Sequence, residues 1–286
     1  MQTIQPETLD SYRTTAFRLC EAERLQNVEQ ALEFVNQCGF VYFWPIKGIL
    51  FPSLWTAVVG NREVADKHDD PGHVTWGWKD DMLDKKQWYY AKILRGKATM
   101  VSLATVPYFY ALSENFGEPE EDYLQTYADG LLTREAKTVY ETILREGPLN
   151  TIALRRAAQM TSKAAKSPFE RALVQLQRDF KILPVAVAEA GVWRYSFVYE
   201  AVHRFYPDLP VKAREISRSK AREHLLTLYF RMLGAATLAE VRKLFQWKPV
   251  DMERSLQTLV ANGGIIPHCQ LPGQSDSYYT LPSLFT

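Results

Sequence analysis

The chain of 286 residues is poor in cysteine and has no long apolar segment. Its cysteines lie far apart and form no Cys-x-x-Cys pair, which argues against a disulfide framework and against a zinc knuckle: Cys20, Cys38 and Cys269. No apolar run approaches the roughly 20 residues that cross a membrane, and residues 1–13 contain no apolar core of a signal peptide. We therefore expect a cytoplasmic protein without membrane association and with free, buried thiols.

Familiar catalytic and cofactor motifs are missing as well. The sequence contains no Gly-x-Ser-x-Gly elbow, no phosphate-binding P-loop and no dinucleotide-binding glycine motif. His68 and His73 enclose two aspartates, but they lack the spacing of helical metal ligands, and Pro71-Gly72 lies between them. An exposed polar loop explains that segment better, so we expect no metal and no cofactor.

The charge is distributed unevenly, although the formal net charge is only +1. Residues 1–133 contain 12 Lys/Arg and 19 Asp/Glu, a net charge of −7. Residues 134–286 contain 22 Lys/Arg and 14 Asp/Glu, a net charge of +8. A basic half fits contacts with phosphate, whereas the acidic half argues against DNA binding along the whole chain.

One block of sequence occurs twice in the basic half. Leu173-x-x-Leu176 precedes Ile182-Leu183-Pro184, and Leu256-x-x-Leu259 precedes Ile265-Ile266-Pro267. In each copy a helix passes into a β-branched run that ends at proline, and a hairpin-like segment follows. This order is typical of a winged helix, so the fold class we expect is mainly α with small β wings, in tandem winged-helix (helix-turn-helix) units.

The length allows two or three domains. We expect an N-terminal, aromatic-rich, helix-turn-helix-like module with an insertion at 1–122, a first winged helix at 123–211 and a second at 212–286. In the first module the patterns predict helices at 7–25 and 27–38, a strand-like run from Phe40 to Pro45, a helix within 79–94 and a strand at 98–103. The tryptophans there, Trp55, Trp76, Trp78 and Trp88, fit core positions better than base stacking.

Capping signals place the helices of the two winged units. A helix is expected from Thr133 to Gly147, another capped by Asn150 or Thr151, and a third opened by a Ser167–Glu170 capping box. Its inner stripe is Phe169, Leu173, Leu176 and Phe180, and its wing is formed by 184–188 and 193–198. In the second unit we expect helices at 224–233, 238–245 and 250–262, a turn at 272–276 and a strand at 278–281, after a basic connector: Lys212, Arg214, Arg218, Lys220 and Arg222.

The outward face of the third helix supplies the candidate DNA contacts. Arg171, Gln175 and Arg178 recur at helical spacing, and such side chains read base edges or hold phosphates. Four further cations precede them: Arg155, Arg156, Lys163 and Lys166. Double-stranded DNA is the partner we expect. A solvated helix face, or a surface that binds a protein partner, is the alternative.

The repeated blocks, the Leu94–Thr99 segment and the first helix pair running into Gly39-Phe40-Val41 resemble a known family. It is the tandem winged-helix superfamily of DNA glycosylases for interstrand crosslinks and azinomycin resistance. The resemblance implies excision of alkylated bases by a Gln-x-Gln or Gln-x-Asp pair just after a Gly-aromatic-aliphatic step. Here Tyr42 and Trp44 occupy those two catalytic positions.

Three functions follow from these observations. The first is a DNA-binding member of that superfamily that is non-catalytic or has altered chemistry. The second is an active DNA glycosylase that uses other residues on alkylated or crosslinked bases, with Glu33 or Asp80/Asp81 acting beside Tyr42. The third is a winged-helix protein-interaction module. Whether the protein is an enzyme stays open at this stage.

Overall fold

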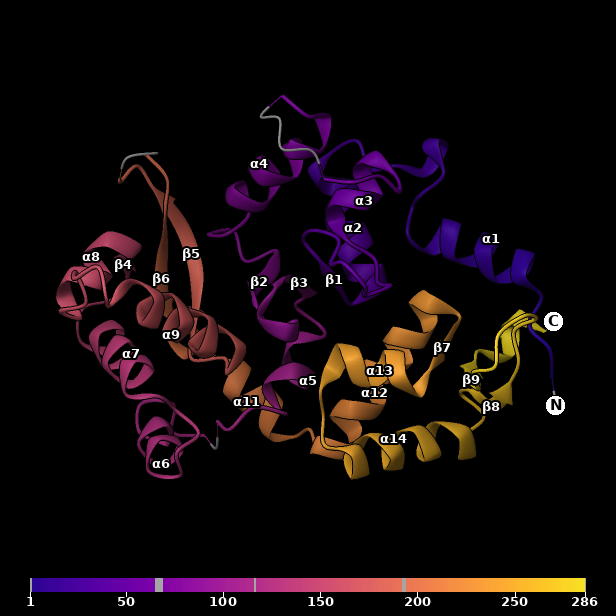
Figure 1. Cartoon of the computed structure of the whole chain (residues 1–286). Helices are drawn as coiled ribbons and strands as arrows, with labels where there is room; N and C mark the ends of the chain where they lie inside the picture. The colour runs from indigo at the N-terminus through magenta and orange to yellow at the C-terminus, as the bar shows by residue number, and fades with distance from the viewer. Residues whose placement is uncertain (1, 65–68, 116, 192–193, 286) are drawn as a thin grey trace. The chain divides into compact units, whose positions relative to one another are not determined.

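The computed structural model describes residues 2–64, 69–115, 117–191 and 194–285, which are mainly α-helical with small antiparallel sheets (Figure 1). The chain forms two compact units, each built from separated segments. The first unit comprises residues 1–78, 100–105 and 218–286, and the second comprises residues 79–99 and 106–217. None of the helices in the described ranges is long and apolar enough to cross a membrane.

The first unit begins with short helical elements and one short strand. They are α1 (Pro6–Ala16), η1 (Glu21–Glu23), α2 (Val28–Cys38), β1 (Phe40–Tyr42), α3 (Leu54–Val59), η2 (Pro71–His73) and the start of α4 (Val74–Asp81). The Asn27 side chain caps α2 by accepting a hydrogen bond from the backbone of Gln30 at 2.9 Å. Gly39 ends α2 with φ +80°, a backbone conformation that favours glycine.

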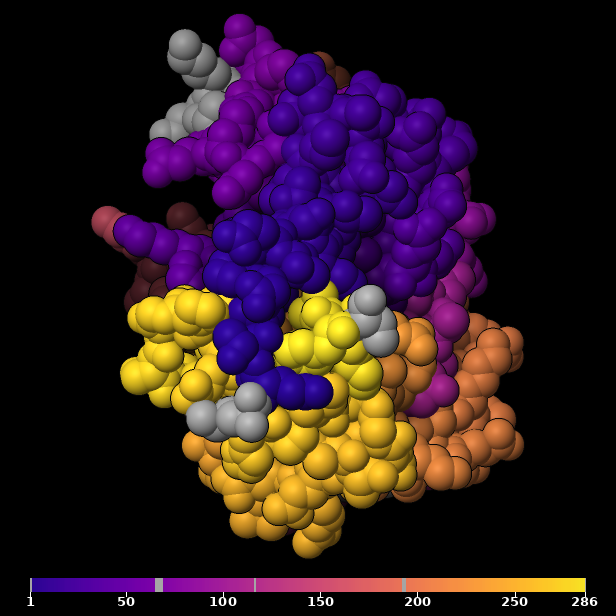
Figure 2. Space-filling model, turned by 90° about the vertical axis from the view of Figure 1, so that its right-hand side faces the viewer, coloured from indigo at the N-terminus to yellow at the C-terminus, as the bar shows by residue number. Residues whose placement is uncertain are grey.

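The same unit ends with α12 (Arg218–Leu233), β7 (Ala235–Thr237), α13 (Leu238–Phe245), α14 (Pro249–Ala261), β8 (Ile266–Cys269), β9 (Tyr278–Thr280) and η4 (Pro282–Leu284). The strands form an antiparallel sheet in the order β7-β9-β8, with Ala235 opposite Thr280. The N-terminal segment lies across this C-terminal region, and the Ile4 amide donates a hydrogen bond of 2.8 Å to the carbonyl of Gln270 (Figure 2).

The second unit contains the end of α4, β2 (Trp88–Lys92), η3 (Leu94–Gly96), the start of β3 (Ala98–Ser102), α5 (Val106–Tyr110), α6 (Asp122–Ala128), α7 (Arg134–Glu146), β4 (Leu149–Asn150), α8 (Thr151–Ala157), α9 (Lys166–Arg178), β5 (Ile182–Ala188), β6 (Ser196–Ala201), α10 (Val202–Phe205) and α11 (Leu209–Arg214). Its antiparallel sheet has the order β4-β6-β5. A core forms where α7, α8 and α9 meet this sheet. Its fully buried side chains include Val139, Tyr140, Ile143, Leu154 and Leu176.

The segments from α7 to β6 and from α12 to β9 share one order of elements. Each contains a helix, a short strand, two helices and two further strands, and in each sheet the last strand lies between the other two. Leu173 on α9 and Leu256 on α14, which mark the repeat in the sequence, are both buried. Helix α13 has the expected bounds of 238–245, and α14 lies one residue before its expected position.

Some local predictions were wrong. The first helix ends at Ala16 because the chain turns left-handed at Arg18, φ +57°, and the Leu19 amide donates to the carbonyl of Thr14. The segment 79–94 contains only the end of a helix, and the aromatic run from Trp88 to Tyr90 forms strand β2. The five residues of the basic connector all lie in helices, since α11 contains Lys212 and Arg214 and α12 contains Arg218, Lys220 and Arg222.

The predicted capping box at Ser167 was also wrong. Helix α9 already begins at Lys166, so Ser167 lies inside its first turn and accepts a hydrogen bond from Arg171 Nη1 at 2.5 Å. Ser162 instead accepts from the backbone of Ala165, at 3.2 Å, in the preceding turn. Phe180 is buried as expected but lies beyond the end of α9, with φ +54°. Trp193 of the predicted wing lies outside the described residues.

Candidate nucleic-acid interface

A groove of about 880 Å³ lies along the exposed side of α9 in the second unit. Its lining comes from α9, from the residues that open α7 and from the end of β2. Three cations line it: Lys92, Arg171 and Arg178. Two carboxylates, Glu135 and Glu170, and several neutral side chains share the lining. The groove can therefore hold an anion that is narrow enough to lie beside a helix.

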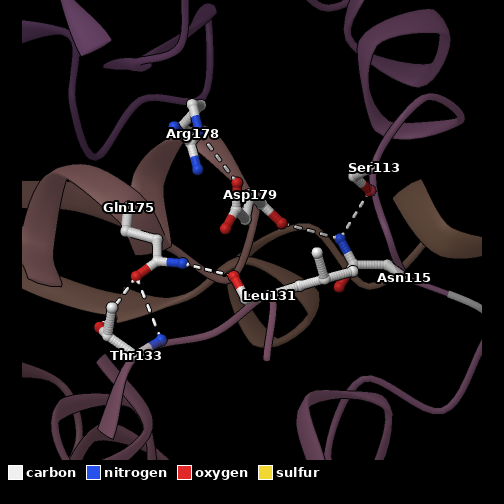
Figure 3. Close-up of polar contacts among 7 residues, drawn as sticks. All are labelled: Ser113, Asn115, Leu131, Thr133, Gln175, Arg178 and Asp179. Carbon is white, nitrogen blue, oxygen red and sulfur yellow. Dashed lines mark hydrogen bonds and ion pairs between the residues drawn. The ribbon is translucent and has the colours of Figure 1, made fainter. Parts of the chain in front are cut away.

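Gln175 lies in this groove, but its amide is bound by the protein itself (Figure 3). Its Nε2 donates to the carbonyl of Leu131 at 2.8 Å, and its Oε1 accepts from the hydroxyl of Thr133 at 2.9 Å and from the Thr133 amide at 3.4 Å. Both ends of the amide thus hold the segment before α7 against α9. The side chain is only partly exposed, as expected for a group with this many internal partners.

The two arginines of α9 are exposed, as the sequence predicted. Arg171 donates from Nη1 to Ser167. Arg178 donates from Nε to Asp179 Oδ1 at 3.1 Å (Figure 3). Burial raises the pKa of the Asp179 carboxyl, and the neighbouring Arg178 opposes that rise. Each of these contacts occupies one guanidinium nitrogen, and arginine offers five N–H donors.

The other predicted cations have different positions. The half-buried Arg155 donates to the carbonyls of Met160 and Ser162, both at 2.7 Å, and so holds the turn between α8 and α9. Arg156, Lys163 and Lys166 are exposed and lie outside the groove lining. The structure therefore gathers Arg171, Gln175 and Arg178 in one groove and leaves Arg155, Arg156, Lys163 and Lys166 outside its lining.

Sequence reasoning missed Lys92 and the basic turn that follows it. Burial lowers the pKa of Lys92, the charge of Glu170 raises it, and the nearby charge of Lys97 lowers it further. Gly96 in this turn has φ +66°, and a Cβ atom there would lie 2.9 Å from Val174 Cγ1 on α9. The Arg95-Gly96-Lys97 sequence, with two cations beside a glycine, was the available signal.

Tyr42 and Trp44, which the resemblance implied as the catalytic positions, lie in aromatic surroundings in the first unit. Tyr42 is 0% exposed and lies edge-on to Phe51, with ring centroids 5.8 Å apart. Trp44 is stacked with His73 at 6.2 Å and meets Trp76 edge-on at 6.0 Å. His68 lies outside the described residues, and within them no group of three His, Cys, Asp or Glu residues could hold a metal.

The carboxylates considered as substitutes have distinct environments. The exposed Glu33 accepts a hydrogen bond from Gln37 Nε2 at 2.9 Å, and Asp81 is also exposed. In the second unit, Asp80 forms an ion pair with Lys79 and accepts from the hydroxyl of Tyr195 at 2.9 Å. Lys79 is only 1% exposed, so burial lowers its pKa while Asp80 opposes the shift.

A protein-family model described as "AlkZ related" matches residues 25–246. The chain belongs to the AlkZ-related family. This membership confirms the resemblance to the crosslink-repair glycosylase superfamily that the sequence suggested. Among solved structures, the Streptomyces sahachiroi DNA glycosylase AlkZ is similar in fold, with a TM-score of 0.57 and 12% sequence identity. The match covers 99% of this chain and 71% of that one. No curated protein matches this chain.

Proposed function

We propose that this protein is a DNA-binding member of the AlkZ-related family with a role in DNA repair, and that the groove on α9 holds duplex DNA. The observation that carries the proposal is the groove itself, which places Lys92, Arg171 and Arg178 around one concave surface. Membership of the family and the fold shared with a DNA glycosylase support DNA as the partner.

We further propose that residues 123–211 and 212–286 each form a winged helix, with 1–122 as an additional helix-turn-helix-like module. The shared order of helices and strands in the first two regions supports this division, as does the identical strand order of their sheets. In the first region α9 takes the position of the third helix, and β5 and β6 form the wing.

In this proposal the protein is non-catalytic toward simple alkylpurines or has altered chemistry. Base excision needs a group that stabilises a cationic sugar and positions water, and a carboxylate or polar pair supplies both. The phenol of Tyr42 is enclosed in the core, and Trp44 contributes an indole to an aromatic cluster. Neither side chain can replace a Gln-x-Gln or Gln-x-Asp pair.

The alternative enzyme function would depend on Asp80. The Tyr195 hydroxyl and the buried Lys79 both contact Asp80 Oδ1, which fixes the orientation of this carboxylate. A carboxylate held in this way could position water or stabilise a cationic sugar. Base release that depends on Asp80 would support this alternative over the non-catalytic one.

The direct test of DNA binding is the affinity for a fluorescent duplex over a series of salt concentrations. Replacing both Arg171 and Arg178 with alanine should weaken binding and flatten the salt dependence by about 0.9 in slope for each lost phosphate contact. The control is Arg145→Ala, which removes one such charge from an exposed side chain at the far end of α7. Unchanged affinity of the double variant would contradict the proposed interface. If the unmodified protein showed no salt-dependent binding to the duplex, the protein-interaction module would be favoured.

A further inference from the structure

We propose that the groove on α9 recognises the phosphodiester backbone of DNA rather than base edges, and that the turn from Lys92 to Lys97 forms its second basic wall. This inference rests on the proposed function and specifies the chemistry that the same groove would recognise. It departs from the usual role of the third helix of a winged helix, which enters the major groove and contacts bases.

The flanks of α9 are the first reason. A helix that reads bases must enter a major groove about 12 Å wide, so its outward face must project freely. Here the backbone of the Leu94–Gly96 turn lies against Val174 on one flank. On the other flank Gln175 binds Leu131 and Thr133. The outward face is thus the floor of a groove, and a convex strand of backbone phosphates fits such a groove better than a base-pair edge does.

The amide of Gln175 is the second reason. Glutamine reads adenine through both its amide nitrogen and its amide oxygen. In this chain both atoms already bind Leu131 and Thr133, so contact with a base would break those hydrogen bonds and separate the start of α7 from α9 (Figure 3). Gln175 is therefore a positioning residue that shapes the groove.

The second wall is built into the fold. The side chain of Gln177 is 2% exposed, and its Oε1 accepts a hydrogen bond from the backbone amide of Lys92 at 3.2 Å. Its Nε2 donates to the carbonyl of Leu173 at 2.9 Å, so this buried side chain fixes the end of β2 on α9. Glycine at position 96 permits the close approach of the turn to Val174, because any side chain would meet Cγ1 of that valine.

The charges on this wall favour an anion. Lys92 lies at the groove and experiences the positive charge of Lys97, with the Glu170 carboxylate as a partial counter-charge. Arg171 and Arg178 line the same groove from α9. A phosphate between the turn and the helix would relieve the repulsion between the lysines and would accept hydrogen bonds from either wall. Phosphates occur at every nucleotide, so such a groove binds DNA of any sequence.

The experiment compares duplexes of AT-rich, GC-rich and mixed sequence, with affinity measured over a salt series. Replacing both Lys92 and Lys97 with alanine should weaken binding to all three equally and reduce the salt slope by about 0.9 per lost contact. Lys85→Ala, which removes an exposed lysine from the same unit outside the groove lining, should leave binding unchanged. Gln175→Ala should leave the ratios of the three affinities unchanged, because no base contact is lost.

The possible contrary results overturn different parts of the proposal. A preference among the duplexes of about fivefold or more that disappears in Gln175→Ala would show base readout and overturn the inference, while DNA binding itself would stand. Binding that depends on Arg171 and Arg178 but not on Lys92 and Lys97 would overturn the second wall. Absence of duplex binding by the unmodified protein would overturn the proposed function. Circular dichroism of every variant, compared with that of the unmodified protein, distinguishes lost contacts from misfolding.

Discussion

Gly39 connects α2 to β1 and so positions Tyr42 and Trp44, the two residues that the family resemblance implies at the catalytic positions. Its φ of +80° lies in the left-handed region, and a Cβ atom there would lie 2.5 Å from Leu228 Cδ1 and 3.0 Å from Thr105 Oγ1. A single missing side chain thus permits both the end of the helix and the close approach of α12. Glycine at this position is explained by packing and backbone conformation, independently of any catalysis.

Replacing Gly39 with alanine should therefore lower the free energy of unfolding by about 2 kcal/mol, from backbone strain and overpacking together. Gly263→Ala is the matched control, since Gly263 has φ +70° but no atom within 4 Å of the added Cβ. That variant should lose only the strain contribution, about 1 kcal/mol. Urea unfolding measures both changes. Equal losses in the two variants would contradict the packing role of Gly39.

At the scale of elements, the N-terminal caps of the helices show which features can be predicted from the local sequence and which cannot. Thr133, Asn150 and Thr237 all cap helices with their side chains. The first two were predicted, because a cap depends on residues within one turn of the chain. Ser167 has the same local pattern, yet the helix begins before it.

The capping difference can be measured directly. Thr237 and Glu240 form a complete capping box, with the Glu240 amide donating to Thr237 Oγ1 at 3.2 Å. Thr237→Ala should cost about 1 kcal/mol of stability. Ser167→Ala, which matches a capping box only in sequence, should change stability by less than about 0.5 kcal/mol. Thermal unfolding of the two variants tests this, and a larger loss in Ser167→Ala would mean that Ser167 does cap α9.

The candidate site shows the same division. The helical spacing of Arg171, Gln175 and Arg178 correctly placed the three side chains on one face of α9. The partners of that face were beyond prediction, because Leu131 and Thr133 lie more than 40 residues away and Lys92 is further still. The bonds that distinguish a positioning glutamine from a base-reading one are formed across that separation. The charge pattern therefore identified the outward face of α9, but it did not show whether Gln175 is available to contact a base.

At the scale of the whole molecule, the central question is whether the protein releases bases. We expect no release of N7- or N3-alkylpurines from duplex DNA above the spontaneous rate, because Tyr42 and Trp44 provide no carboxylate or polar pair. Replacing Tyr42 with Gln and Trp44 with Asp should not restore release, since the ring of Tyr42 is fully buried. Abasic sites, converted to strand breaks by alkali, report the rate.

The contrary result is equally specific. It would be that the protein releases bases above the spontaneous rate. If Asp80→Asn abolished this release, catalysis would be assigned to the Lys79–Asp80–Tyr195 network. If Glu33→Gln abolished base release, catalysis would be assigned to Glu33 on α2 instead. Asp84→Asn, which alters an exposed carboxylate four residues from Asp80, is the control and should leave any release unchanged.

The discontinuous first unit determines the order in which the two units can fold during synthesis. Residues 1–78 are synthesised before the second unit, but some of their ring and backbone partners are synthesised after it: Phe51 stacks on Tyr229 at 5.9 Å, and Arg13 donates to the carbonyls of Leu233 and Ala235. The second unit is fully synthesised in between. The second unit can therefore fold before the unit that contains the N-terminal residues, whereas N-terminal domains usually fold first. Throughout synthesis of the middle of the chain, the first 78 residues expose apolar surface that a molecular chaperone would recognise.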